Sequence, residues 1–514
     1  MKNSNKPAKS KIPSFILELP LIINHSDERI LNIRLESARQ LYNAVLGEAL
    51  KRLSLMKESS LWQYARSLPK NNKEQISERS KEFKLCATRF KFTDYDIQSY
   101  GTVCKNSCQI GEHLDTHTAQ KISTRAFKSV QRYQFKQSGK PRFKSKWKSL
   151  NSVESKSNAS GIRWRDDHIE WSGLNLRVAF DKKDKHDIQA YALQSKIKYC
   201  RIVLKTVKGK QRFFVQLILS GFPKIKSKNI ISTGKACIDI GPSTIALVSD
   251  KDAFLKEFCP NSKQLKKHIH RIQRAMDRSK RLSNPDNFNI NGTVKKGRLK
   301  WAFTNGYLRL KAKLSELHRI LAAYRKTEHG KLANIVLSKA NIIMSEKLSY
   351  KSFQKNYGKS IRDKAPGMFV SILRRKAENA GGEVIEFPTK TTKLSQTCQC
   401  GSIVKKPLSQ RWHICPVCGI KAQRDLYSAY LGLFVYQDND IWNLDIDSAC
   451  KSWNTAEPLL EKAMSDVFQI ASSGKVPVSF GIKTGDRAIP FQSSVVMQRG
   501  LGCCNNKDSF IARA

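Results

Sequence analysis

Acidic residues are scarce in this sequence. Its 514 residues include 43 Asp and Glu against 93 Lys and Arg, which gives a formal net charge of +50 at pH 7. Self-repulsion of this size opposes a compact fold unless a polyanion neutralises it, so we expect nucleic acid as the partner, in preference to a small acidic substrate. A membrane-surface protein and a charged coat that aids solubility are the alternatives. The chain is too long for one ordinary core, and we expect about two to four domains.

Long apolar runs and a secreted type of cysteine framework are also missing. No stretch approaches the ~18 apolar residues that a membrane span needs, so we expect no membrane partner. The apolar run at 15–23 is too short, and too closely followed by charge, for a signal peptide. Nine of the 13 cysteines are scattered singly or in unmatched pairs. We therefore expect a reducing, cytoplasmic location, with the protein at the nucleoid when it acts on DNA.

The other four cysteines form two close pairs with fourteen residues between them. Zn²⁺ prefers four soft thiolates in short chelate loops, so this spacing predicts a zinc ribbon. The glycine after each pair suits the tight turn of a metal-binding knuckle. Four buried free thiols are the alternative. Because the first pair is one residue shorter than the usual C-x-x-C, His413 is a reserve ligand. The predicted ligands are Cys398, Cys400, Cys415 and Cys418.

Sequence patterns in the first half of the chain predict a β-domain interrupted by helices. Residues 14–24 and several short alternating runs between 160 and 223 are typical of strands, and together they predict a small antiparallel barrel or sandwich. Between them, apolar residues three or four apart indicate amphipathic helices rimmed by Arg and Lys. The predicted boundaries are 1–12 for a disordered basic N-terminus, 13–30 and 126–225 for the β-barrel, and 31–125 for the inserted helical lobe.

A basic and aromatic stretch follows the helices. Residues 125–148 hold nine basic residues and no acidic one, interleaved with aromatic side chains. Cations that attract phosphates and rings that stack on bases are typical of a groove for single-stranded or hybrid nucleic acid. A solvated helix surface is the alternative. The candidate nucleic-acid contacts are Lys140, Arg142, Phe143, Lys144, Lys146, Trp147 and Lys148.

Strands and helices alternate from about 235 to 387, which predicts an α/β sheet domain. Three carboxylates stand out in and after it: Asp239 lies in the first strand, Glu346 ends a later strand, and Asp425 begins a helix after the cysteine pairs. Two Mg²⁺ ions ~3.5–4 Å apart, held by such oxygen ligands, can hydrolyse a phosphodiester. Considered singly, each acid is equally typical of a solvated strand end.

Three segments carry a resemblance to a known family. IDIG at 238–241, IIMSEKLSY at 342–350, and QRDLYSAYL at 423–431 just after the cysteine pairs resemble the three RuvC motifs and the zinc ribbon of the TnpB family. These proteins are transposon-encoded RNA-guided DNA nucleases related to the compact type V CRISPR effectors. The segments 139–149 and 35–52 are similar in character to the family's N-terminal barrel and helical lobe.

The resemblance implies a multidomain α+β fold. The N-terminal β-barrel with its helical lobe is followed by an RNase H-like (RuvC) nuclease domain into which the zinc ribbon is inserted. It also implies that Asp239, Glu346 and Asp425 hold two Mg²⁺ ions, that the four cysteines hold structural Zn²⁺, and that guide RNA and target double-stranded DNA are the partners of a monomer or dimer. The predicted boundaries are 233–392 and 423–470 for the nuclease domain, 393–422 for the ribbon and 471–514 for a C-terminal tail.

The chain departs from the family pattern in two places. One is the short first cysteine pair, and the other is the sequence after Asp425, which reads Leu-Tyr-Ser-Ala where the family usually shows x-Asn-Ala-Ala. Tyr427 or Ser428 therefore stands in place of a polar amide. We predict an RNA-guided DNA endonuclease because all three acids are present. A non-cleaving RNA-guided DNA-binding regulator or transposition targeting factor, and a DNA-binding transposase, are the alternatives.

Overall fold

The computed structural model describes residues 12–146, 150–407, 409–474 and 476–482. The chain divides into two compact units at the boundary between Lys224 and Ile225. Most of the predicted N-terminal and C-terminal tails lies outside the described residues. None of the helices in the described part of the chain combines the length and hydropathy needed to cross a bilayer.

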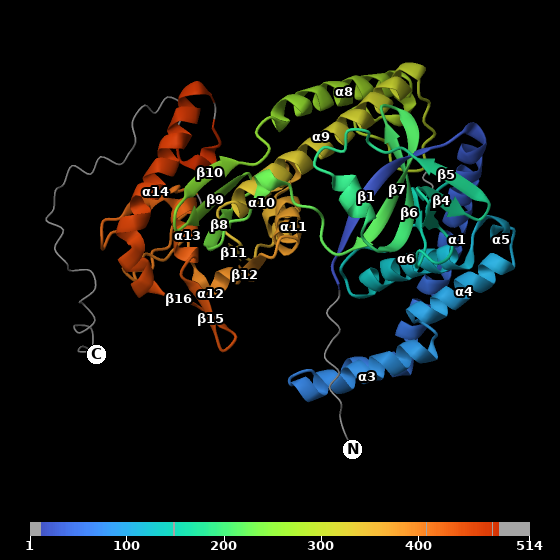
Figure 1. Cartoon of the computed structure of the whole chain (residues 1–514), viewed down its shortest axis with the longest axis horizontal. Helices are drawn as coiled ribbons and strands as arrows, with labels where there is room; N and C mark the ends of the chain where they lie inside the picture. Colours follow the sequence, from blue (N-terminus) through green and yellow to red (C-terminus); the bar gives the residue numbers. More distant parts are fainter. Residues whose placement is uncertain (1–11, 147–149, 408, 475, 483–514) are drawn as a thin grey trace. The chain divides into compact units, whose positions relative to one another are not determined.

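The helices of the first unit cover more of the chain than the predicted lobe at 31–125 (Figure 1). The long first helix begins at His25 because Asn24 and Asp27 form a capping box, in which the Asn24 side chain accepts from the backbone N–H of Asp27. The helices are α1 (His25–Glu58), α2 (Ser60–Ser67), α3 (Lys73–Arg89), α4 (Asp94–Asn106), α5 (Ile110–His113), α6 (Thr116–Gln134) and α7 (Ile188–Leu193).

The strands of this unit form one seven-stranded antiparallel sheet in the order β2-β6-β7-β1-β5-β4-β3. The predicted barrel is not confirmed, because β2 and β3 end the order without pairing with each other in the described residues. Each of these end strands has three residues and is paired along one edge in the described residues, β2 with β6 and β3 with β4. The strands are β1 (Ser14–Ile22), β2 (Ser152–Glu154), β3 (Arg163–Arg165), β4 (His168–Trp171), β5 (Leu174–Val178), β6 (Ile197–Val207) and β7 (Lys210–Ser220).

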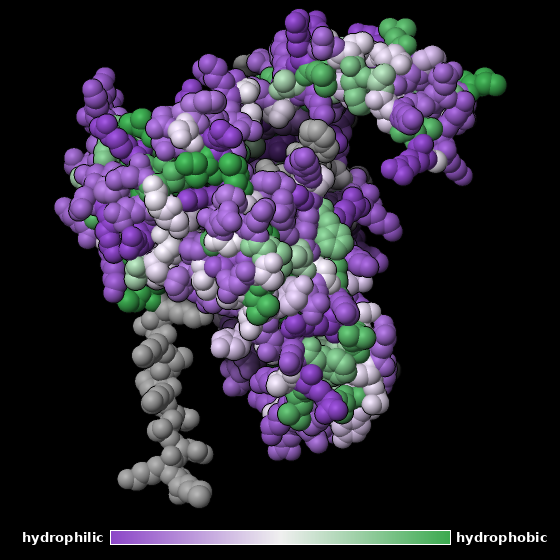
Figure 2. Space-filling model, turned by 90° about the vertical axis from the view of Figure 1, so that its right-hand side faces the viewer, coloured by the Kyte–Doolittle hydropathy of each residue, from purple (hydrophilic) through white to green (hydrophobic). Residues whose placement is uncertain are grey.

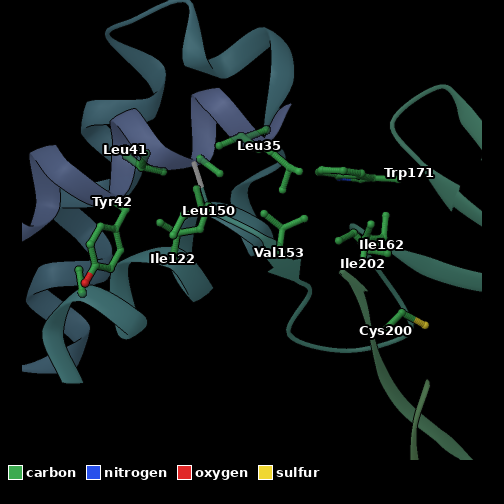
Figure 3. Packing of buried hydrophobic residues seen from close by; sticks show 14 of the residues in the cluster. Leu35, Leu41, Tyr42, Ile122, Leu150, Val153, Ile162, Trp171, Cys200 and Ile202 are labelled. Carbon is green, nitrogen blue, oxygen red and sulfur yellow. The ribbon is translucent and has the colours of Figure 1, made fainter. Parts of the chain in front are cut away.

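Helices and sheet of the first unit share one hydrophobic core. Figure 3 shows Leu35 of α1 near Trp171 of β4, and Ile122 of α6 beside Leu150, with Val153 of β2 between this pair and Ile202 of β6. Burial of these side chains is the main favourable contribution to folding. The outer surface is different: the face in Figure 2 is mostly hydrophilic, with hydrophobic residues in separate patches.

The second unit is built on a five-stranded sheet in the order β10-β9-β8-β11-β12. The first three strands form an antiparallel meander, whereas β11 and β12 run parallel to β8. The strands are β8 (Lys235–Ile240), β9 (Thr244–Ser249), β10 (Ala253–Glu257), β11 (Ile342–Glu346) and β12 (Glu383–Phe387). The helices are α8 (Ser262–Leu282), α9 (Asn305–Leu337), α10 (Tyr350–Lys364), α11 (Pro366–Glu378), α12 (Thr389–Thr392), α13 (Arg424–Gly432) and α14 (Ile446–Ser473).

Two cores cover the two faces of this sheet. Helices α9 and α11 pack on one face, and α13 and α14 pack on the other. Two small antiparallel pairs complete the unit on the α13 side. They are β13 (Trp412–Ile414) with β14 (Lys421–Gln423), and β15 (Val435–Asp438) with β16 (Ile441–Leu444).

Candidate active site, zinc site and nucleic-acid surfaces

Asp239 and Glu346 lie on neighbouring parallel strands. The register of β8 and β11 places them side by side across the strand pair. Side chains alternate between the two faces of a sheet, and Cys237 and Met344, two residues earlier on each strand, pack in the core that contains α13. Both acids therefore point to the face that α13 covers.

Asp425 lies in the first turn of α13. The Gln423 side chain caps this helix by accepting from the backbone N–H of Leu426 at 2.8 Å. The backbone N–H of Arg424 donates to the carbonyl oxygen of Arg411 at 2.9 Å, which ties the start of the helix to the cysteine-containing segment. Because α13 packs on β8 and β9, it carries the third acid toward the two strand acids.

The three acids form one electrostatic group. Burial raises the pKa of Asp239 well above its usual range, and repulsion from Asp425 and Glu346 raises it further. Burial also raises the pKa of Glu346 to about 7 and raises that of Asp425. Arg424 opposes the shifts at all three acids, and Arg411 opposes them at Asp239 and Asp425. A bound divalent cation would relieve this repulsion.

Each of the three acids is half-buried: enough of its surface is covered to disfavour the charged form, and enough remains exposed for a cation to reach it. Among the described residues, the acids do not form a group whose ligand atoms all lie within 4.8 Å of one another. Two Mg²⁺ ions ~3.5–4 Å apart need ligands spread around them. What fits Mg²⁺ here is the chemistry of the donors, because carboxylate oxygens are the ligands that hard cations prefer.

The four cysteines do form such a group: their sulfur atoms all lie within 4.8 Å of one another. Cys398 Sγ lies 3.5 Å from Cys418 Sγ, and Cys400 Sγ lies 3.6 Å from Cys415 Sγ. A tetrahedral ion with Zn–S bonds of ~2.3 Å separates its sulfur ligands by ~3.8 Å. The donor set and its spacing therefore fit Zn²⁺.

The short first cysteine pair reaches the cluster without help from the reserve ligand. His413 lies outside the group of four, and its Nδ1 accepts from Lys406 Nζ at 2.5 Å. The glycines of both knuckles adopt the left-handed backbone conformation, with φ of 84° at Gly401 and 73° at Gly419. The expectation of a tight turn after each cysteine pair is thus confirmed.

The predicted nucleic-acid contacts lie on an exposed loop of the first unit. The backbone of Lys144 fixes this loop to α1: its N–H donates to Asn43 Oδ1, and its carbonyl accepts from Asn43 Nδ2, both at 2.8 Å, and from Arg39 Nη1 at 2.9 Å. Trp147 and Lys148 lie outside the described residues. Exposed side chains are those of Lys140, Arg142, Phe143, Lys144 and Lys146.

A second basic surface combines part of the basic stretch at 125–148 with Lys121, and the sequence analysis did not predict the cavity that it lines. A cavity of about 440 Å³ lies between α6 and the strands β2 and β6. Four basic residues of α6 recur every three or four positions and so share one helix face. Glu154 pairs with Arg201 at 2.6 Å and with Lys121 at 3.6 Å, while Lys128 and Arg132 have no acidic partner among the described residues. The four are Lys121, Arg125, Lys128 and Arg132.

Residues 367–431, from α11 to α13, match the family model described as "Cas12f1-like, TNB domain". This part of the chain contains all four cysteines and Asp425. The match supports the TnpB family and the compact type V effectors as the relatives of this chain, so the resemblance noted in the sequence is confirmed.

Solved structures with some likeness to the whole chain have low sequence identity. One is described as the "Cas12f1-sgRNA-target DNA complex", with 11% identity, a TM-score of 0.43, and coverage of 81% of this chain and 98% of that chain. Another is a "CRISPR-Cas12f Ternary Complex", with 13% identity, a TM-score of 0.26, and coverage of 79% and 81%. A third is the "mini-RNA-guided endonuclease CRISPR-Cas_phi3", with 11% identity, a TM-score of 0.33, and coverage of 81% and 91%. A search of the curated proteins found no match.

Proposed function

We propose that this protein is an RNA-guided DNA endonuclease that hydrolyses target DNA with two Mg²⁺ ions at a RuvC-like site. The electrostatic group of Asp239, Glu346 and Asp425 on one face of the sheet is the observation that carries this proposal. The sheet order, with an antiparallel meander followed by two parallel strands, favours an RNase H-like fold for the second unit. The match to a Cas12f1-like domain adds the RNA-guided class.

Each acid has a distinct structural role in this proposal. Asp239 and Glu346 sit on neighbouring strands, which hold ligand spacing more rigidly than loops do. Asp425 completes the set from the start of α13. The three acids would hold Mg²⁺, and the chemistry supplied at this site would be activation of water and neutralisation of charge on the phosphodiester. Arg411 and Arg424 favour the deprotonated carboxylates and so help the acids to bind cations near neutral pH.

The first unit would hold the nucleic acid. Guide RNA and a guide–target hybrid present a dense row of phosphates, which the exposed loop at 140–146 and the basic cavity beside α6 can neutralise. Base pairing would supply sequence specificity, as in RNA-guided effectors generally. The strand that pairs with the guide would come from target double-stranded DNA, which is the second proposed partner.

The proposal is tested by expressing the chain with its native flanking DNA, sequencing the RNA that copurifies, and adding the complex to a plasmid library with randomised sequence beside the target. We expect guide-dependent cuts that require Mg²⁺ and disappear in the Asp239→Ala variant. Guide-dependent binding without cuts would instead favour the non-cleaving regulator. Strand-transfer products with transposon-end DNA would favour the transposase, and the absence of any discrete RNA would overturn both RNA-guided functions.

A further inference from the structure

The two places where this chain departs from the family pattern meet in the structure. Tyr427, which replaces a polar amide, has its Oη 3.4 Å from the sulfur of Cys398 in the short first knuckle. The backbone N–H of Gln399, the single residue between the first two cysteines, donates to the same oxygen at 3.0 Å. The tyrosine hydroxyl therefore contacts both the first cysteine and the shortened loop that follows it.

The Tyr427 side chain is held in one orientation. Only 1% of its surface is exposed. Its ring stacks on His413, with centroids 4.1 Å apart and an interplanar angle of 28°, and packs edge-on against Trp453 of α14 at 5.5 Å. A buried phenol held between two neighbouring rings in this way can aim its hydroxyl with little loss of conformational entropy on forming the hydrogen bond.

The short knuckle holds one residue, Gln399, between its two cysteines, whereas the second knuckle holds two, Pro416 and Val417. The backbone N–H of Gln399 donates to the Tyr427 oxygen, and that oxygen also lies within hydrogen-bond distance of the sulfur of Cys398. The phenol therefore connects the backbone of the short knuckle to its first sulfur.

The hydrogen-bond directions suit a donor role for the phenol. Gln399 N–H donates to the oxygen of Tyr427, and a zinc-bound thiolate carries no proton, so the phenol O–H would be the donor to the sulfur of Cys398 in the zinc-bound protein. Metal-bound thiolate sulfur accepts such hydrogen bonds, and outer partners of this kind orient ligands and tune affinity for the metal.

We propose that Tyr427 is a positioning residue that links the backbone N–H of Gln399 to the sulfur of Cys398 and so holds Cys398 in place for zinc. The inference rests on the proposed zinc site. It also links that site to the start of α13, because Tyr427 lies two residues after Asp425 on the same helix. Zinc binding would thereby steady the third acid of the candidate active site.

Tyr430 is a matched control on the same helix. It is also buried, its hydroxyl donates to the carbonyl oxygen of Ala449, and its ring packs near Trp453 at 5.3 Å. Tyr430→Phe therefore removes a buried phenol hydroxyl without removing a contact to a cysteine. A general loss of packing or hydrogen bonding would affect both variants alike.

The test compares Tyr427→Phe with Tyr430→Phe in the full chain with its copurified RNA. Zinc release is titrated with a chelator, and the thiolate-to-metal charge-transfer band is recorded after substitution with Co²⁺. We expect Tyr427→Phe to lose roughly 10- to 100-fold in zinc affinity and to shift the band, while Tyr430→Phe retains zinc like the unmutated chain. A glycine inserted after Gln399 should restore zinc affinity in the Tyr427→Phe background by lengthening the knuckle.

Equal zinc affinity in Tyr427→Phe and the unmutated chain, or equal loss in the two tyrosine variants, would overturn the inference. Zinc content of the unmutated chain separates this failure from that of the zinc site itself. An unmutated chain that carries no zinc would refute both, whereas loss of guided cleavage with normal zinc content bears on the proposed nuclease alone.

Discussion

Asp239 of β8 and Glu346 of β11 are side-by-side neighbours on parallel strands, and both face α13. Burial, followed by the charges of Asp425 and Glu346, raises the pKa of Asp239, and burial raises that of Glu346 to about 7. Without a cation these carboxylates repel one another. The following predictions use this relationship and the basic surfaces around it.

Replacement of Asp239 by Asn should stabilise the metal-free protein while abolishing cleavage. A carboxyl with a raised pKa in the folded state lowers stability above its unfolded pKa, because its charged form is disfavoured there. Removal of this charge should raise Tm by a few degrees at about pH 8 in EDTA, since about 1 kcal/mol corresponds to ~2–4 °C in a unit of this size. Differential scanning fluorimetry measures the shift. Asp286→Asn, at an exposed position of the same unit, is the control, and an unchanged or lower Tm for Asp239→Asn would contradict the prediction.

The Mg²⁺ concentration that cleavage requires should fall as the pH rises. Below the pKa of about 7 the Glu346 carboxyl is protonated in the metal-free protein and is a poor ligand, whereas above it the carboxylate is available. The Mg²⁺ concentration for half-maximal cleavage should therefore fall between about pH 6 and pH 8. The free energy of unfolding of the metal-free protein should decrease as the pH rises from 4.5, the ordinary pKa of a glutamate, to about 7, the pKa of Glu346 in the folded state. In this pH range the folded state binds more protons than the unfolded state. A flat Mg²⁺ requirement across this range would exclude Glu346 as the titrating ligand.

Arg411→Gln should shift the pH profile of cleavage to higher pH. Arg411 is the strongest opponent of the raised pKa at Asp425, and it also acts on Asp239. Loss of its charge should raise both pKa values further and increase the Mg²⁺ requirement near pH 7. Arg411→Lys keeps the charge and serves as the control. If the Arg411→Gln and Arg411→Lys variants gave the same pH profile of cleavage, the charge at position 411 would have no effect on the pKa values of the acids.

Lys128→Gln combined with Arg132→Gln should weaken nucleic-acid binding and reduce its salt dependence. Each lost phosphate contact lowers the slope of log K against log salt by ~1, so the double variant should lose ~2. Binding of the guide RNA at several salt concentrations gives the slope. The exposed pair Lys182→Gln and Lys183→Gln removes the same charge elsewhere in this unit. Equal effects from both pairs would show that the cavity beside α6 is not a specific binding site for nucleic acid.

Much of the fold could be predicted because local patterns decide local structure. The short alternating runs between 160 and 223 predicted strands, and two of these runs form the hairpin of β6 and β7. The three-to-four spacing of apolar residues before them predicted amphipathic helices, and α1 buries such a face. Closure of the N-terminal sheet could not be judged in this way, since strand order and the pairing of distant edges depend on contacts between segments far apart in sequence.

The sequence by itself determined the ligand chemistry: two cysteine pairs followed by glycines, and three acids at strand or helix ends. Only the tertiary structure decided how these parts meet. The parallel register sets Asp239 beside Glu346. The backbone hydrogen bond between Arg424 and Arg411 holds the segment that carries Arg411 against the start of α13. Helix packing places the Tyr427 hydroxyl against Cys398. Sequence spacing specifies which face of a strand or helix a side chain occupies, but interactions between elements depend on three-dimensional packing, which local periodicity does not encode.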